Sequence, residues 1–232
     1  MLFKSNLSSK NNYRRYYNKT NIDEPYKADA SSIARRALKN LSLGYLVRTK
    51  DSECLETCYE QFNTASNMTD RAAALRQLVN SSCEQGKNLG AQALDTFYQQ
   101  WQHEPLVVDQ WFVIQATCQS LNTLNQVESL LTHEAFDIKN PNKVRSLIGA
   151  FCGQNHIGFH QQSGEGYEFL ADRILELDKL NSQIAARLLI PLTKWKKYDS
   201  NRQALMQAQL NRIKANADLS KDVYEVAEKS TV

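Results

Sequence analysis

Apolar residues along the chain recur every three or four positions, which is the spacing of one face of an α-helix. Asp29 opens one such segment, and aspartate is a residue type that caps helix N-termini. The apolar positions that follow are Ile33, Ala37, Leu38, Leu41 and Tyr45. This spacing predicts a helix over 29–45 with one apolar stripe, of the kind that normally faces a core.

The same spacing continues to the end of the chain and predicts about ten or eleven helices joined by short loops. Asn140-Pro141 marks the sharpest helix start, since Asn suits the cap and Pro the first helical position. His156, Gly158, His160, Gly164 and Gly166 fall in a predicted loop that follows Gly153. The predicted helices cover residues 29–45, 55–62, 70–78, 89–101, 105–118, 124–131, 140–151, 169–177, 184–189, 205–213 and 220–227.

Composition supports an all-α fold class. The chain has 232 residues with 8 Gly and 4 Pro, where average usage gives roughly 28 of the two together, so few tight turns of the kind that β-sandwiches need are available. Consecutive helices with short connections pack antiparallel. The pattern therefore predicts a superhelical α-solenoid of antiparallel helix pairs, HEAT- or armadillo-like. Because no fixed-period sequence repeat accompanies it, a compact multi-helix bundle is the structural alternative.

The formal charge of +3 is unevenly distributed. The first twenty residues contain five bases and no acid: Lys4, Lys10, Arg14, Arg15 and Lys19. We interpret residues 1–16 as a disordered or frayed basic tail and residues 17–232 as one helical domain. Because the excess charge lies in the tail, no nucleic-acid partner is predicted.

Two further features bear on the compartment. No apolar run approaches the ~18–20 residues of a membrane-spanning helix, so no membrane partner is predicted. The five cysteines are odd in number and no secretory signal precedes them, which favours free thiols in the cytoplasm. Cys54 and Cys58 lie one turn apart, but buried thiols are a better interpretation than a metal pair, because no further Cys or His pair completes a site.

Catalytic motifs are incomplete throughout the sequence. A zincin needs H-E-x-x-H on a helix, and both His103-Glu104 and His133-Glu134 lack the second histidine. His156 and His160 are four apart but have no glutamate between them. No P-loop and no G-x-S-x-G elbow is present. The residues therefore predict no catalytic group, no metal site and no cofactor in this chain.

Several longer motifs resemble the last domain of bacterial aminopeptidase N, the alanyl aminopeptidases of the gluzincin class. They are N-M-T-D-R at 67–71, D-Q-W-F at 109–112, N-P-N-K-V-R-S-L-I-G-A-F at 140–151, G-E-G-Y-E-F-L at 164–170 and L-S-K-D-V-Y-E at 219–225. The resemblance covers residues from about 17 to the C-terminus. In that family the zinc ligands and catalytic residues lie in an earlier domain, so the chain alone should be inactive.

The resemblance implies a function that the residues alone do not. The family's C-terminal domain is an all-helical superhelix that caps the catalytic domain and restricts access of peptides to the active site. The implied partners are that catalytic domain and, indirectly, the peptide substrate. The family's N-x-Q-x-A-x-R segment places Gln183 and Arg187 on the wall of the substrate pocket. The alternative is a free-standing helical scaffold that binds another protein.

Overall fold

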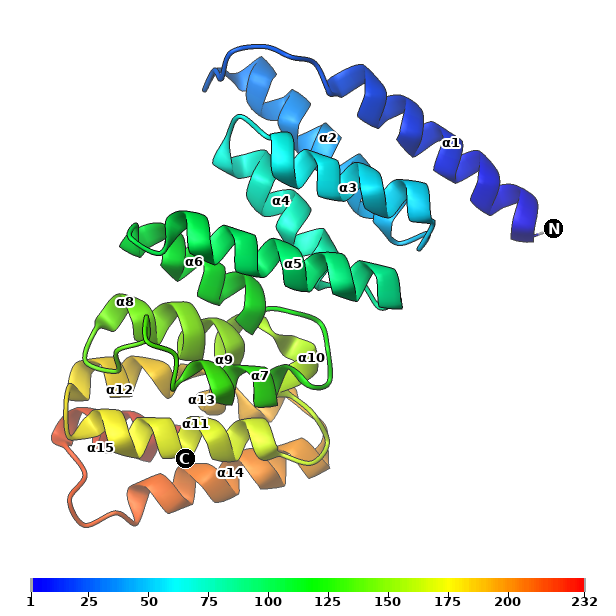
Figure 1. Ribbon diagram of the computed structural model, residues 1–232. Coiled ribbons are helices and arrows are strands. Elements are labelled where there is room, and N and C mark those ends of the chain that lie inside the picture. Colours follow the sequence, from blue (N-terminus) through cyan, green and yellow to red (C-terminus); the bar gives the residue numbers. More distant parts are fainter. Residues whose placement is uncertain (1, 232) are drawn as a thin grey trace. The chain divides into compact units, whose positions relative to one another are not determined.

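The computed structural model describes the backbone of residues 2–231 and the side chains of residues 10–230. Within these residues the structure is helical and contains no strand (Figure 1). The chain divides into two compact units, Met1–Trp101 and Gln102–Val232. The all-α prediction is confirmed.

The first unit consists of five helices that pack on their neighbours in sequence. Their bounds are α1 Leu2–Thr20, α2 Ala30–Val47, α3 Ser52–Thr64, α4 Met68–Val79 and α5 Glu84–Trp101. Side-chain oxygens of Asp29, Asp51 and Asn67 accept hydrogen bonds from backbone N–H groups in the first turns of α2, α3 and α4. The predicted cap at Asp29 is therefore present, and each of these three helices begins at a polar residue that satisfies its free donors.

Residues 10–16 differ from the frayed tail that the sequence suggested, because α1 runs through them. Tyr13 stacks on Tyr45 of α2 with ring centroids 4.2 Å apart, and Tyr17 is buried. Lys10 pairs with Asp51 at 3.0 Å. The basic residues thus lie on one helix that packs on α2, with Tyr13 as its aromatic contact there. The side chains of residues 1–9 lie outside the described residues.

Helix α2 forms where the periodicity predicts it, but its faces are the reverse of the expected ones. Leu38 and Leu41 of the predicted stripe are exposed, whereas Arg36 and Lys39 are buried. Two features of the inward side account for this: Lys39 pairs with the buried Asp70 of α4, and the C-terminal half of the helix buries Leu43, Leu46 and Val47. Periodicity locates a helix and its stripe, but it does not determine which side has a partner.

The second unit contains the remaining helices (Figure 1). They are α6 Pro105–Ala116, α7 Thr123–Leu130, α8 Pro141–Val144, a π-helical turn Arg145–Gly149, α9 Ala150–Gln154, α10 His156–Phe159, α11 Glu165–Asp178, α12 Ser182–Leu188, α13 Ile190–Thr193, a 3₁₀ turn Trp195–Lys197, α14 Ser200–Lys214 and α15 Lys221–Thr231. The described residues thus include more helical segments than the ten or eleven expected, because α8 and α9 are parts of one interrupted helix and α10 lies in the predicted loop.

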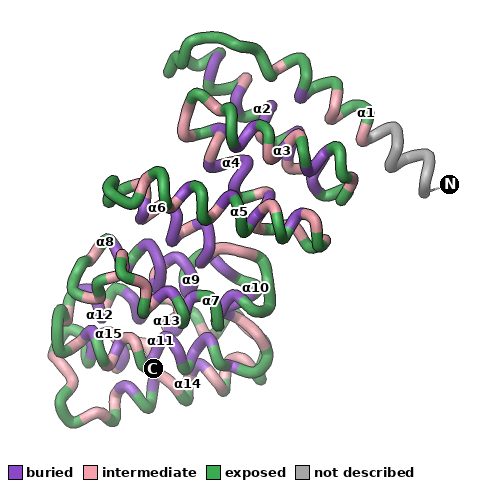
Figure 2. Tube along the Cα trace, in the orientation of Figure 1, coloured by how far each residue is buried: buried purple, intermediate pink, exposed green. Residues whose placement is uncertain are grey.

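Buried residues recur along the helices of the second unit (Figure 2). Its core is rich in aromatic side chains in edge-to-face contact. Phe151 contacts Phe159 and Phe169 at centroid distances of 6.0 and 5.7 Å. Val144, Leu147, Ile148 and Phe151 are fully buried, as the stripe over 140–151 predicts. This packing positions α9 and the π-helical turn beside α12.

Candidate functional site

Helix α12 contains both residues that the sequence placed on a pocket wall. The Asn181 side chain caps the helix by accepting from the Ile184 N–H at 3.2 Å. Ile184, Ala185 and Leu188 form the buried face. Gln183 and Arg187, four residues apart, are both exposed and lie on the same side of the helix.

A pocket of about 330 Å³ lies where α12 meets the π-helical turn and α13. Arg187 lines it, and Gln183 does not. The other lining residues are Arg145, Gly149, Cys152, Gly153, Ile184, Leu188, Ile190, Pro191 and Lys194. Apolar side chains and glycines thus form most of the lining, and three cationic side chains complete it.

Arg145 and Lys194 are the two charged lining residues that the sequence analysis did not assign to a site. Arg145 opens the π-helical turn, a feature that often accompanies functional positions. Lys194 belongs to the basic run 194–197, which the sequence suggested only as a solvated helix end. The two lie 49 positions apart, so no local pattern connects them, and only the packing of α12 against the turn brings them to one pocket.

The charges and apolar groups of the lining indicate which kind of ligand would suit this pocket. Three positive charges around an apolar lining favour a ligand with an anionic group and an apolar body. The one thiol in the lining belongs to Cys152, and complete burial raises the pKa of that thiol well above its ordinary value. A protonated thiol is a poor nucleophile.

His160 lies in a hydrogen-bonded cluster elsewhere in the second unit. Its Nδ1 is 2.9 Å from the Tyr167 hydroxyl, and its Nε2 is 2.8 Å from the Tyr198 hydroxyl. Arg202 Nε donates to the His160 carbonyl at 2.8 Å. Burial, together with the charges of His156 and Arg202, lowers the pKa of His160 to about 4. A neutral ring can donate from one nitrogen and accept at the other, which suits two hydroxyl partners.

This cluster predicts an acid-sensitive contribution to stability. Between pH 6.5 and about 4 the unfolded chain binds a proton at His160 that the folded chain does not. The free energy of unfolding should therefore fall as the pH falls through this window, by about 1–2 kcal/mol after allowance for the ring's partial exposure. Urea unfolding at pH 7 and pH 4.5 of the wild type and of His160→Gln measures it. Equal pH dependence in the two proteins would contradict the assignment.

The other candidate metal ligands are dispersed in the fold. Among the described residues no group of three or more His, Cys, Asp or Glu side chains could hold a metal ion. Cys54 and Cys58 are free and buried, as the sequence suggested. Cys58 Sγ donates to the Ala74 carbonyl at 3.4 Å, and burial raises the pKa of its thiol.

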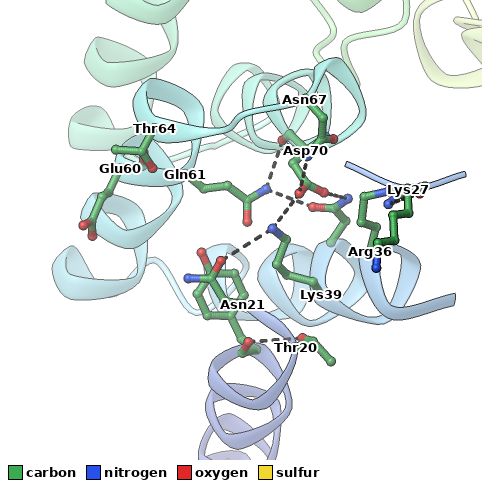
Figure 3. Close-up of polar contacts among 12 residues, drawn as sticks. Thr20, Asn21, Lys27, Arg36, Lys39, Glu60, Gln61, Thr64, Asn67 and Asp70 are labelled. Atoms are coloured by element: carbon green, nitrogen blue, oxygen red, sulfur yellow. Dashed lines mark hydrogen bonds and ion pairs between the residues drawn. The ribbon is translucent and has the colours of Figure 1, made fainter. Parts of the chain in front are cut away.

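The first unit contains a polar hollow of about 910 Å³ beside a buried ion pair (Figure 3). Lys39 Nζ lies 2.6 Å from Asp70 Oδ2. Asn40 Nδ2 donates to Asp70 Oδ1 at 2.8 Å, and Gln61 Nε2 donates to the Asp70 carbonyl at 3.0 Å. Asn67 both caps α4 and donates to Asp70 Oδ2. Lys39 and Asn40 of α2, Gln61 of α3 and the cap of α4 thus meet at Asp70, so this network connects the three helices. Gln61 Oε1 is the one buried oxygen of these side chains that has no hydrogen-bond partner among the described residues.

The helix pairs and the family comparison define the class of protein. The chain belongs to the family described as "Domain of unknown function (DUF3458_C) ARM repeats", whose model matches residues 4–232. This confirms the armadillo-like prediction, and the match begins before residue 17, where the sequence suggested that the helical domain starts. No helix within the described part of the chain combines the length and apolar character needed to cross a bilayer.

Relatives identify the type of protein in which this domain occurs. The chain is 38% identical to "Aminopeptidase N" of Haemophilus influenzae over 223 residues, which are 96% of this chain and 25% of that protein. It is also 38% identical to "Aminopeptidase N" of Escherichia coli over 205 residues, 88% of this chain and 23% of that protein. The chain thus spans about a quarter of these relatives, and the resemblance to the C-terminal helical domain of bacterial aminopeptidase N is confirmed.

A solved structure agrees with these relatives. The crystal structure of Legionella pneumophila aminopeptidase A in complex with aspartic acid matches with a TM-score of 0.86 and 36% identity. The match covers 96% of this chain and 26% of that one. The chain is therefore a helical domain of the aminopeptidase type, and the part it matches is a minor fraction of each relative.

Proposed function

We propose that this chain is the non-catalytic C-terminal domain of a zinc aminopeptidase, where it caps the catalytic domain and restricts access of peptides to the active site. The similarity over 96% of the chain to aminopeptidase N carries the proposal. The family resemblance assigns the zinc and the catalytic groups to the catalytic domain of the parent enzyme, and the described residues contain no group of three or more ligands for a metal ion. The five free cysteines suit a cytoplasmic enzyme.

Gln183 and Arg187 form the part of the surface that meets the substrate. A glutamine amide can both donate and accept, and an arginine adds positive charge beside Arg145 and Lys194. These groups select among peptides without taking part in bond cleavage. Their role is in specificity, and we assign no catalytic residue to this chain.

A chimera tests this proposal. In it, the chain replaces the aligned region of the Haemophilus influenzae aminopeptidase N. We expect Gln183→Ala and Arg187→Ala to change the ratio of kcat/KM between alanyl and acidic substrates by about three- to tenfold, the effect of one lost hydrogen bond or charge contact. The matched controls Asn211→Ala and Lys179→Ala remove one amide and one cation at exposed positions outside α12. Unchanged substrate preference in both test variants would refute the role of α12.

A further inference from the structure

The outward face of α2 is an apolar stripe. Ile33, Leu38, Leu41 and Tyr45 are 52%, 41%, 57% and 41% exposed. Their spacing of five, three and four residues places them on one side of the helix over about three turns. Contiguous exposed apolar surface on a folded unit usually marks an interaction site.

The polar network (Figure 3) and the buried apolar residues in the C-terminal half of α2 together hold the helix in this orientation. Arg36 Nη1 donates to the Lys27 carbonyl at 2.9 Å, and its guanidinium lies 4.6 Å from the centre of the Tyr26 ring. Lys39 is held by Asp70. Rotating the helix to bury the stripe would break these contacts and leave Asp70 buried without its cation, which is strongly unfavourable.

Helix α1 packs on α2 without burying the stripe (Figure 1). Among the described side chains of α1, Tyr13 stacks on Tyr45, yet Tyr45 stays 41% exposed. The stripe therefore retains free apolar surface after the first unit has folded.

Helix α15 of the second unit shows what a solvent-facing helix looks like in this protein. Its buried residues include Val223 and Ala227. Its outer side contains Lys221, Glu225 and Lys229, which form i,i+4 ion pairs. Terminal repeats of armadillo-type proteins require such a polar outer face, whereas inner repeats are apolar where the next repeat packs. By this criterion, α2 has the surface of an inner repeat.

We propose that the α2 stripe is the docking face for a further pair of amphipathic helices, supplied by the part of an aminopeptidase N polypeptide that this chain does not span. Two observations select this occupant. The fold is built of repeats that bury their faces against one another, and the Haemophilus relative is 25% covered, which leaves most of its length outside the match. The inference rests on the proposed function, since it assumes the same parent enzyme.

Hydroxyl-radical footprinting of the isolated chain and of the Haemophilus chimera tests the docking face. We expect the modification rates of Leu41 and Tyr45 to fall roughly fivefold in the chimera. Burial would reduce the exposed fractions of these side chains from 57% and 41% to about 10%. Unchanged rates at both residues would overturn the proposal. The proposed function would survive that result if the chimera still showed the substrate effects of Gln183→Ala and Arg187→Ala.

A substitution gives a second, independent readout. Leu41→Glu should leave the thermal midpoint of the isolated chain within about 1 °C of wild type, because an exposed side chain is changed. In the chimera it should lower the midpoint by about 5 °C or more, because a charge is placed in a buried contact. Leu180→Glu, at a residue 48% exposed in the second unit, is the matched control and should have little effect in either protein.

Light scattering distinguishes a different occupant. The isolated chain should be monomeric by this measurement, and Leu41→Glu should not change its mass. A dimer that Leu41→Glu dissociates would identify a second copy of this chain as the occupant and would overturn the proposal. In the thermal experiment, an equal fall of the midpoint for Leu41→Glu in the isolated chain and in the chimera would also overturn the proposal. Leu41 would then stabilise the first unit itself and not a contact with further helices.

Discussion

Replacing Gly166 with alanine is expected to destabilise the second unit by about 3 kcal/mol, at the upper end of the range for overpacking. A Cβ at this position would lie 2.4 Å from the Phe159 carbonyl oxygen and 3.1 Å from its carbonyl carbon. Both atoms belong to the backbone of α10, so a side-chain rotation cannot relieve the contact. Helix α10 would have to move away from α11, and this would disturb the buried Phe159 ring and its contacts with Phe151 and Tyr167.

Gly153→Ala is the matched control for this prediction. Gly153 is in α9, and nothing lies within 4 Å of a Cβ built on it. Alanine is favoured over glycine in a helix, so the variant should be more stable by about 0.5–1 kcal/mol. Urea unfolding followed by circular dichroism measures both variants. Similar stabilities for the two would show that α11 does not approach α10 as closely as the structure indicates.

The fold class was predictable because local signals decide it. Asn140 accepts from the Asn142 N–H and Pro141 occupies the first helical position, as the dipeptide predicts. The scarcity of Gly and Pro removes most alternatives to helix. The π-helical turn Arg145–Gly149 gave no such signal, because its apolar spacing is compatible with an ordinary α-helix. Helix α10 was missed because Gly158 suggested a loop, whereas the Asn155 side chain caps a short helix there.

Long-range pairing was the part that the sequence did not reveal. The apolar stripe over 29–45 was located correctly, but its exposure depends on Lys39 meeting Asp70, which is 31 positions away. The site shows the same limit. Gln183 and Arg187 share a helix, so their common face followed from the i,i+4 spacing. Arg145 and Lys194 complete the pocket from separate elements, and no local pattern places them beside Arg187.

Asp70→Ala should lower the free energy of unfolding of the first unit by about 3–5 kcal/mol, because it leaves a buried cation without its partner. Asp70 is 2% exposed and Lys39 is 8% exposed. The carboxylate also accepts from Asn40 and Asn67, at 2.8 and 3.1 Å. The substitution therefore removes the acceptor of three donors that come from α2 and from the cap of α4. Urea unfolding is the measurement.

Two controls separate the loss of pairing from the loss of packing. Glu24→Ala breaks the Arg35–Glu24 pair, which spans 3.0 Å in the same unit but has a carboxylate 44% exposed. This change should cost no more than about 1 kcal/mol. Lys39→Met combined with Asp70→Leu removes both charges, and it should recover much of the stability that Asp70→Ala loses, since apolar replacement of a buried pair is often neutral. If the double variant were as unstable as Asp70→Ala, packing rather than the unpaired cation would explain the loss. The orientation of α2, with its apolar stripe outward, would then rest on the burial of Leu43, Leu46 and Val47.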